Sequence, residues 1–192
     1  LRALHRHSGY LEREIEDLEN KASIIQLVEE LSKRKADLNA AISQLRDDNA
    51  ARQTEQEKRL AIAYTAIADE VIKLLHGDLR REESFEQAKS IQFDFGDNYI
   101  TVDGVSYFSA SSRAILKSSF FVSLLIAALK HPFFRHPRFA MLDTIEDKGM
   151  EPARSQNLQR MIVATSKASP VQHQIIIATA MIAQELDTLE YT

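Results

Sequence analysis

The chain has 192 residues, 44% of them hydrophobic, which is enough for one ordinary domain with a packed core, or for a smaller domain with an appendage. It contains no cysteine, which excludes thiolate zinc sites, disulfide scaffolds and cysteine nucleophiles. Its formal net charge of -4 gives no general attraction for nucleic acid, so any such contact has to come from a local patch.

Residues 11–60 are predicted to form a coiled-coil helix. They contain no Gly, Pro or aromatic residue, and they carry 9 Lys or Arg and 12 Asp or Glu. Apolar residues recur at alternating steps of four and three, and then every seven residues, which is the spacing of a coiled-coil seam. The seam consists of Leu11, Ile15, Leu18, Ala22, Ile25, Val28, Leu31, Leu38, Ile42 and Leu45. At about 1.5 Å per residue, fifty such residues span about 75 Å, so a helix this long and this polar needs a partner helix.

A second apolar stripe predicts that the helical pattern resumes after a polar gap at residues 47–59. This stripe ends near His76-Gly77, where glycine is a natural C-terminal cap. Two arrangements of residues 1–76 remain open: a long arm that leads into a globular head, which we favour, and a helical hairpin that packs on itself. We therefore divide the chain into an arm with its connecting helix, residues 1–78, and a head, residues 79–192.

The first half of the head is predicted to be a β-hairpin followed by a long helix. From Ile91 apolar residues recur at every second position, and Gly96-Asp97-Asn98 supplies the turn, as in a β-hairpin. A serine-rich stretch then precedes a helix from about Ala110 to Lys130, which His131-Pro132 ends. The longest apolar run of this helix, Phe120 to Leu129, is about half of a membrane span. The N-terminus has no signal-like apolar core, so we expect a soluble, cytoplasmic protein with no membrane partner.

Two short apolar runs in the second half of the head are predicted to be buried parallel strands. The first is Arg138 to Leu142, closed by Asp143, and the second is Gln174 to Ala178, closed by Thr179. A helix over residues 152–166, opened by a proline, lies between them, and the order strand, helix, strand predicts a βαβ crossover.

The side chains that could carry chemistry gather where these two strands end. Ligands of open α/β sheets bind outside the carboxyl ends of the strands, which is where Asp143, Thr144, Glu146, Asp147 and Thr179 fall. An apolar strand that ends in a single Asp, here Asp143, is how a nucleotide hydrolase places a carboxylate near Mg²⁺, usually through water. A helix cap or turn former is the alternative role for such an Asp.

In the order of its elements the chain resembles the C-terminal lobe of the ABC-type head of SMC-like coiled-coil ATPases, a group that includes RecN-like and double-strand-break-repair ATPases. The resemblance runs from the arm to Thr179. The fold class that it implies is α/β: a partial ABC-type ATPase head lobe, with parallel strands, crossover helices and a β-hairpin, carrying a long N-terminal coiled-coil helix. The chain has no G-x-x-x-x-G-K-[ST] loop, so the resemblance implies that an N-terminal lobe supplies it.

The first motif of the resemblance lies at the start of the helix after the hairpin. The family has a signature close to S-G-G-[QE]-[KR], which corresponds here to Ser109, Ala110, Ser111, Ser112 and Arg113. The first Ser and the basic fifth position match, while both glycines and the Gln or Glu are replaced. Backbone N–H groups at a helix N-terminus, with serine hydroxyls and the helix dipole, favour a phosphate. The resemblance implies that this turn binds the γ-phosphate of an ATP held on an opposing head; a plain serine N-cap is the alternative.

The second motif is the segment RFAMLDTIEDKG, which is similar to the Walker B strand and places Asp143 in the Mg²⁺ position. The family has its catalytic Glu directly after this Asp, where this chain has Thr144. We assign the general base to Glu146, because it is the only Glu on the loop immediately after Asp143. The family's next loop aligns with Asp147 to Met150, and Thr179 completes the predicted nucleotide-binding residues. ATP and Mg²⁺ are the implied cofactors.

The resemblance implies the C-terminal half of an ATPase that binds and hydrolyses ATP between two heads. Its implied partners are the missing lobe, a coiled-coil partner helix, a second head and DNA, in repair, chromosome maintenance or anti-phage defence. Two alternatives remain open. One is a non-catalytic coiled-coil module with a degenerate head, and the other is a metal-dependent nuclease built on Asp143, Glu146 and Asp147.

Overall fold

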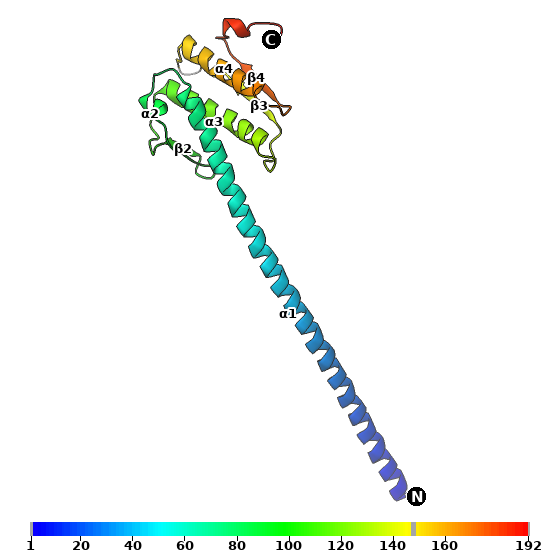
Figure 1. Ribbon diagram of the computed structural model, residues 1–192. Coiled ribbons are helices and arrows are strands. Elements are labelled where there is room, and N and C mark those ends of the chain that lie inside the picture. The colour runs from blue at the N-terminus through cyan, green and yellow to red at the C-terminus, as the bar shows by residue number, and fades with distance from the viewer. Residues whose placement is uncertain (1, 147–148, 192) are drawn as a thin grey trace. The chain divides into compact units, whose positions relative to one another are not determined.

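The computed structural model describes residues 2–146 and 149–191 and divides into two units, Leu1–Lys58 and Arg59–Thr192. It is mixed α/β, with a long N-terminal helix and two small sheets (Figure 1), as the sequence predicts. The elements, in chain order, are α1 (Arg2–His76), α2 (Glu83–Glu86), β1 (Ile91–Asp94), β2 (Tyr99–Val102), α3 (Ala110–Lys130), β3 (Phe139–Asp143), α4 (Pro152–Lys167), β4 (Gln174–Ala178) and a 3-10 turn, η1 (Gln184–Leu186).

α1 is one uninterrupted helix of 75 residues, so the helical hairpin considered for residues 1–76 is wrong. The polar gap at residues 47–59 does not end the helix, because it contains Ala, Arg, Gln and Glu, which are good helix formers, and neither Gly nor Pro. The boundary between the two units falls at the end of this gap, whereas the sequence division follows residue 78. The difference arises because Ile67, Val71 and Leu74 of α1 pack into the core of the second unit.

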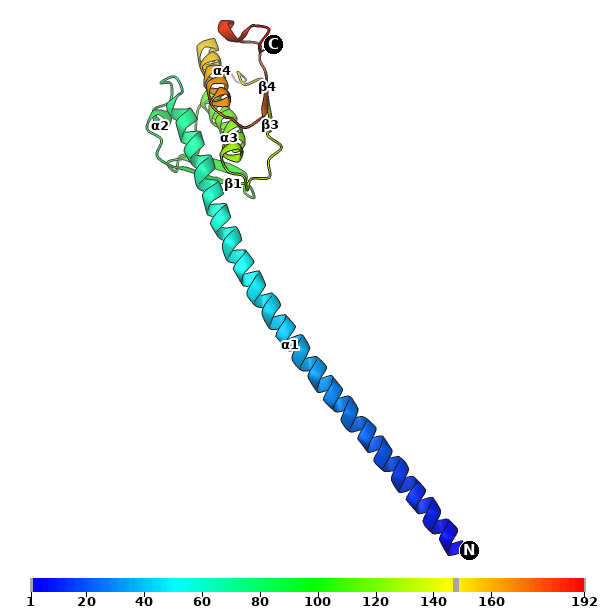
Figure 2. The same ribbon diagram turned by 45° about the vertical axis from the view of Figure 1, so that its right-hand side comes forward.

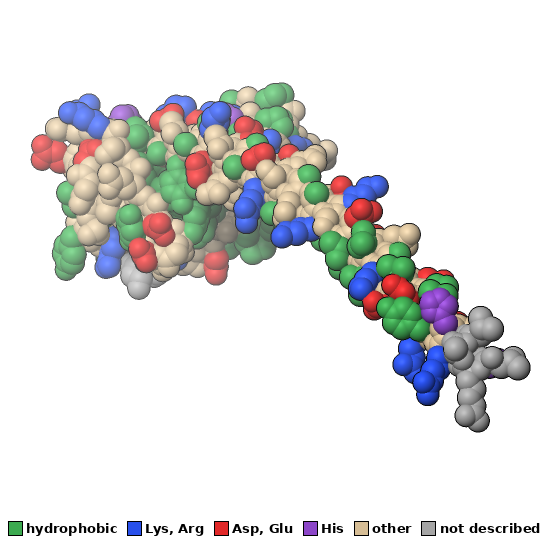
Figure 3. All heavy atoms as spheres, turned by 90° about the horizontal axis from the view of Figure 1, so that it is seen from below, with side chains coloured by type: hydrophobic (Ala, Val, Ile, Leu, Met, Phe, Trp, Pro, Cys, Tyr) green, Lys and Arg blue, Asp and Glu red, His purple; other side chains and the backbone are tan. Residues whose placement is uncertain are grey.

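The first unit is a helix whose apolar seam has no cover within the described chain. The seam side chains from Leu11 to Leu45 that are large and apolar are between 44% and 62% exposed. Figure 3 shows hydrophobic side chains along the arm between charged ones. Asp17 and Lys21, one turn apart, form an ion pair at 2.6 Å, of the kind that adds a few tenths of a kcal/mol to an exposed helix.

Helices α1, α3 and α4 share the core of the second unit with α2, the β-hairpin and β3. The last turns of α1 contribute Ile67, Val71 and Leu75, which pack in one buried cluster with α3 and α4. α3 and α4 lie between the end of α1 and the β3–β4 sheet in both ribbon views (Figures 1 and 2). Gly77, directly after α1, is where the chain passes α4: a Cβ added there would stand 2.3 Å from the sulfur of Met161.

α3 has the bounds that the sequence predicts, Ala110 and Lys130. It is long and apolar enough to cross a membrane by length and composition, and 61% of its most apolar 18-residue window is buried inside the protein. A core helix of a soluble domain has this burial. Ser109, its N-cap, accepts a hydrogen bond from the backbone N–H of Ser112, so the serine-rich stretch begins the helix as expected.

The predicted β-hairpin is confirmed. β1 and β2 pair antiparallel, with Phe93 opposite Ile100, and the turn falls between them as the Gly96-Asp97-Asn98 signal indicates. The ring of Phe93 stacks on Tyr64 of α1, with centroids 4.6 Å apart, and meets Phe120 of α3 at 4.9 Å. These aromatic contacts fix the hairpin against the two helices.

The parallel pair is also confirmed, and α4 is its crossover helix. β3 and β4 are in register from Phe139 opposite Gln174 to Asp143 opposite Ala178. The expectation that both strands are buried is wrong: of their residues only Leu142 is buried, and Met141 is 64% exposed. The physical reason is that the sheet has two strands, with α3 against one face, while the near-continuous apolar runs are typical of strands covered on both faces.

Candidate functional site

The carboxyl ends of β3 and β4 lie side by side, so the loops that follow them leave the sheet at the same edge. Asp143 is opposite Ala178, and the N–H of Thr144 donates to the carbonyl of Ala178 at 2.9 Å. Thr144 has a φ of +51°, an uncommon conformation for a β-branched residue. Its hydroxyl donates to Oδ1 of Asp143 at 2.9 Å, which fixes that carboxylate at the end of the strand.

Asp143 and the first turns of α3 line the same pocket, of about 530 Å³. α3 contributes Ala110, Arg113 and Lys117 to its wall, and β3 contributes Asp143. Arg113 and Lys117 are exposed, so the pocket combines two cationic side chains with one carboxylate. A pocket of this size and charge is suited to a small phosphorylated ligand together with a cation.

Glu146 is not in that pocket; it joins the two loops beside it. Glu146 is buried, with 8% of the residue exposed. Its Oε1 accepts from the backbone N–H of Ala180 at 2.5 Å, and its Oε2 accepts from the hydroxyl of Thr179 at 2.9 Å. The predicted base and the predicted nucleotide-binding Thr179 are therefore in contact, across 33 residues of sequence.

These contacts hold Glu146 in its charged form. Burial by itself raises the pKa of a carboxylate, but the backbone N–H of Ala180, the backbone of Glu146 itself and the Thr179 hydroxyl together lower the pKa of Glu146 below its ordinary value. At neutral pH the group is a carboxylate that can accept a proton. Its lowered pKa makes it a weaker base than a free Glu.

The serine turn divides into an exposed part and a buried part. Ser109 and Arg113 are exposed, Ala110 and Ser111 are half-buried, and Ser112 is buried. The Ser109 hydroxyl donates to the Ser112 hydroxyl at 3.0 Å. The first turn of α3 has no acidic residue, so none of its own side chains opposes an anion there.

Sequence reasoning missed Arg154, which lies beneath the serine turn. Its side chain is 3% exposed and forms an ion pair with Asp78, the second residue after α1, at 2.6 Å. The same guanidinium donates to the hydroxyls of Ser111 and Ser112 at 3.3 Å. A sequence signal existed: Arg154 stands four and eight residues before Leu158 and Ile162 on the buried face of α4, where a charge requires a partner.

The predicted residues thus form three neighbouring groups and not one. Ala110, Arg113 and Asp143 share the pocket. Glu146 contacts Thr179, and Ser109, Ser111 and Ser112 form the turn above Arg154. Asp147, which the nuclease alternative needs, lies outside the described residues. Among the residues that the structure describes, no three His, Asp or Glu side chains come together as a metal site.

No known protein family matches the chain. No curated protein is significantly similar to it in sequence.

Proposed function

We propose that the chain is the C-terminal half of an SMC-like ATPase head, which binds and hydrolyses ATP between two heads. The observation that carries the proposal is the arrangement of three elements: β3, which ends in Asp143, lies parallel to β4, and α3, which begins with the serine turn, packs against β3. In this proposal Asp143 holds Mg²⁺, and Ser109, Ser111 and Arg113 complete the nucleotide site of the opposing head. Ser112 is buried, so its part is to hold the turn.

Two uncovered surfaces support the proposed partners. The apolar outer face of β3 and β4, with Met141 and Ile176 exposed, fits a sheet that a P-loop-bearing lobe completes. The apolar seam of α1 fits a partner helix of the coiled coil. The reason for proposing DNA as the substrate of the assembly is the resemblance described above, and not a basic surface of this chain.

The proposed role of Glu146 is general base for the attacking water. Its carboxylate is charged at neutral pH and lies on the loop after Asp143. The hydrogen bonds from Thr179 and Ala180 hold it away from the pocket, so a shift of this loop on nucleotide binding belongs to the proposal.

The non-catalytic alternative has one observation in its favour, the same engagement of Glu146 by Thr179 and Ala180. In this alternative the carboxylate of Glu146 has no catalytic part, and its contacts only join the two loops. The two proposals differ in their response to nucleotide, because a structural module associates equally with and without Mg-ATP.

The test uses the complex that a tagged copy of the chain recovers from its native cells, assayed for ATP hydrolysis. We expect Asp143→Asn to lower kcat by at least about 100-fold, because the bound cation loses its carboxylate, and Glu146→Gln to lower it similarly. Asp97→Asn, in the exposed hairpin turn, is the matched control and should leave turnover unchanged. A complex that hydrolyses no ATP, or an Asp143→Asn complex with wild-type turnover, contradicts the proposed function; wild-type turnover in Glu146→Gln contradicts only the assignment of the base.

A further inference from the structure

The ion pair between Asp78 and Arg154 is the most deeply buried charge pair of the described chain. The two side chains are 2% and 3% exposed, and the guanidinium meets both carboxylate oxygens at 2.6 to 3.1 Å. The free-energy cost of removing two charges from water can exceed what their attraction inside the protein gains. Apolar residues of similar volume therefore often stabilise a protein as well or better. Stability alone therefore does not account for this pair.

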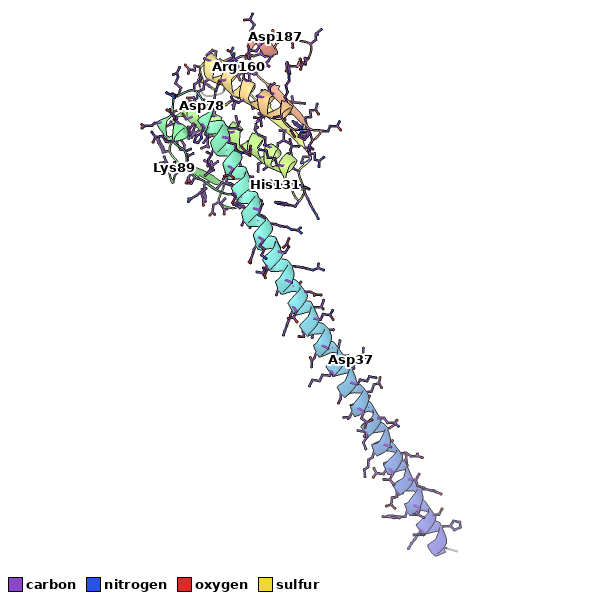
Figure 4. The ribbon with its side chains drawn as sticks, viewed as in Figure 1. Asp37, Asp78, Lys89, His131, Arg160 and Asp187 are labelled. Carbon is purple, nitrogen blue, oxygen red and sulfur yellow. The ribbon has the colours of Figure 1, made fainter. Side chains whose placement is uncertain are left out.

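The remaining donors of Arg154 account for it better. Arg154 donates to Ser111 and Ser112, in the first turn of α3. It therefore joins three segments that are distant in sequence: the residues after α1, where Asp78 lies (Figure 4), the first turn of α3, and the first turn of α4. Only a planar fork with several N–H groups can make these contacts at once.

The charges of this network are arranged so that the turn keeps its attraction for an anion. Asp78 neutralises Arg154 inside the protein. The exposed side chain of Arg113 and the positive end of the α3 dipole remain as the positive groups on the surface. Arg154 therefore acts on the turn through hydrogen bonds to its serines and does not itself reach a ligand.

We propose that Arg154 is a positioning residue: it holds the Ser109 to Ser112 turn in the geometry that receives a phosphate, and Asp78 ties this geometry to the end of α1. The inference rests on the proposed function and deepens it, because it names what sets the affinity of the serine turn for nucleotide. A phosphate bound at the turn and a displacement of the end of α1 are then linked through one side chain.

The test separates positioning from stability with an apolar pair. Asp78→Leu combined with Arg154→Met removes both buried charges at similar volume, so the melting temperature should stay within a few degrees of wild type. In the complex recovered with the tagged chain, we expect KM for ATP to rise about tenfold, because the serine hydroxyls lose their donor. Arg154→Lys keeps the charge without the fork and should give a smaller rise.

The matched control is the ion pair of Arg160 (Figure 4) with Glu185, which involves the same helix α4 but is exposed at the surface. Arg160→Met combined with Glu185→Leu should change neither KM nor melting temperature. If the Asp78→Leu, Arg154→Met complex has a wild-type KM, the positioning role is overturned while the proposed function stands. If the wild-type complex shows no response to ATP, both proposals are overturned.

Discussion

Glu70 joins α1 to α3 through two lysines. Its Oε1 accepts from Lys73, one turn further along α1, and from Lys130, the last residue of α3, at 2.7 Å each. Burial acts to raise the pKa of Glu70, but the hydrogen bonds and charges of Lys130 and Lys73 outweigh it, so the pKa is lowered. A carboxylate whose pKa is lower in the folded state stabilises the fold above its unfolded pKa, and that contribution is lost as the pH falls through the folded pKa.

We predict that Glu70→Gln lowers the free energy of unfolding of the second unit by about 1 to 2 kcal/mol at pH 7. Both lysines are more than half exposed, so solvent screening keeps the loss in this range. The loss should shrink as the pH falls through the lowered pKa of Glu70, below which the wild-type side chain is protonated as well. Urea unfolding followed by near-ultraviolet circular dichroism of the tyrosines, of which only Tyr10 lies in the first unit, measures it without the far-ultraviolet helix signal of the arm.

Asp69→Asn is the control, since Asp69 is exposed on the same helix and should have little effect. A loss for Glu70→Gln that does not shrink as the pH falls through the lowered pKa of Glu70 would show that packing, and not charge, is responsible.

At the scale of single residues, the sequence predicts what is local and misses what is paired at a distance. Asp143 and Thr179 stand at the ends of their strands because strand ends follow from apolar runs. The contact between Glu146 and Thr179 depends on the register of β3 against β4, which no local pattern specifies. The pairing of Arg154 with Asp78 was not predicted, because the two residues are 76 positions apart in the sequence.

At the scale of elements, α3, β3, α4 and β4 were predicted within one residue of their bounds, whereas α1 begins at Arg2, before the predicted start at Leu11, and continues through the polar gap. α2 and η1 were missed because they have four and three residues, too few for a period to appear. α2 begins at Glu83, and Arg81, just before it, pairs with Glu151 at 2.6 Å. The prediction that β3 and β4 are buried was wrong, because burial depends on which other elements cover a strand. The residues of the strand itself do not determine this.

The end of α1 gives a prediction at the same scale. Gly77 is where the sequence expects a cap, but its φ is not in the left-handed region, which among glycines only Gly104 and Gly149 adopt in the described chain. Glycine is required at position 77 because there is no room for a side chain: the sulfur of Met161 in α4 lies where a Cβ would stand. We expect Gly77→Val to destabilise the second unit by about 1 to 3 kcal/mol, and Gly77→Ala to cost less, because the thioether can move aside.

Adding Met161→Ala to Gly77→Val should recover part of the loss, which chemical denaturation of the single and double variants would measure. Gly9→Ala serves as the comparison, because nothing lies within 4 Å of the Cβ site there and the exchange favours the helix. A loss in Gly77→Val that is additive with Met161→Ala would contradict the crowding.

At the scale of the whole molecule, the first unit has no core of its own. Helices in proteins owe most of their stability to packing of an apolar face, and the seam of α1 is exposed throughout the first unit. We predict that the purified chain associates through this seam, with helicity at 222 nm and mass by light scattering both rising with concentration.

Leu31→Lys combined with Leu38→Lys should abolish this concentration dependence, because like charges at seam positions oppose pairing. Ala40→Lys, two residues after Leu38 and off the seam, should leave it intact. A mass and a helicity that do not change with concentration in the wild-type chain would show that the seam does not bind a second copy and needs a different helix.

The two-stranded sheet also bears on how fast the backbone exchanges hydrogen with solvent. β3 and β4 each pair along one edge, and the described residues supply no strand for the other edge. Alternate N–H groups of a strand point toward opposite edges, so about half of the amides in residues 139–143 and 174–178 have no strand partner and take up deuterium rapidly. A strand that arrives at either edge would slow these amides in an alternating pattern. The rate of deuterium uptake at alternate residues of β3 and β4 therefore reports whether a further strand has joined the sheet, before the identity of that strand is known.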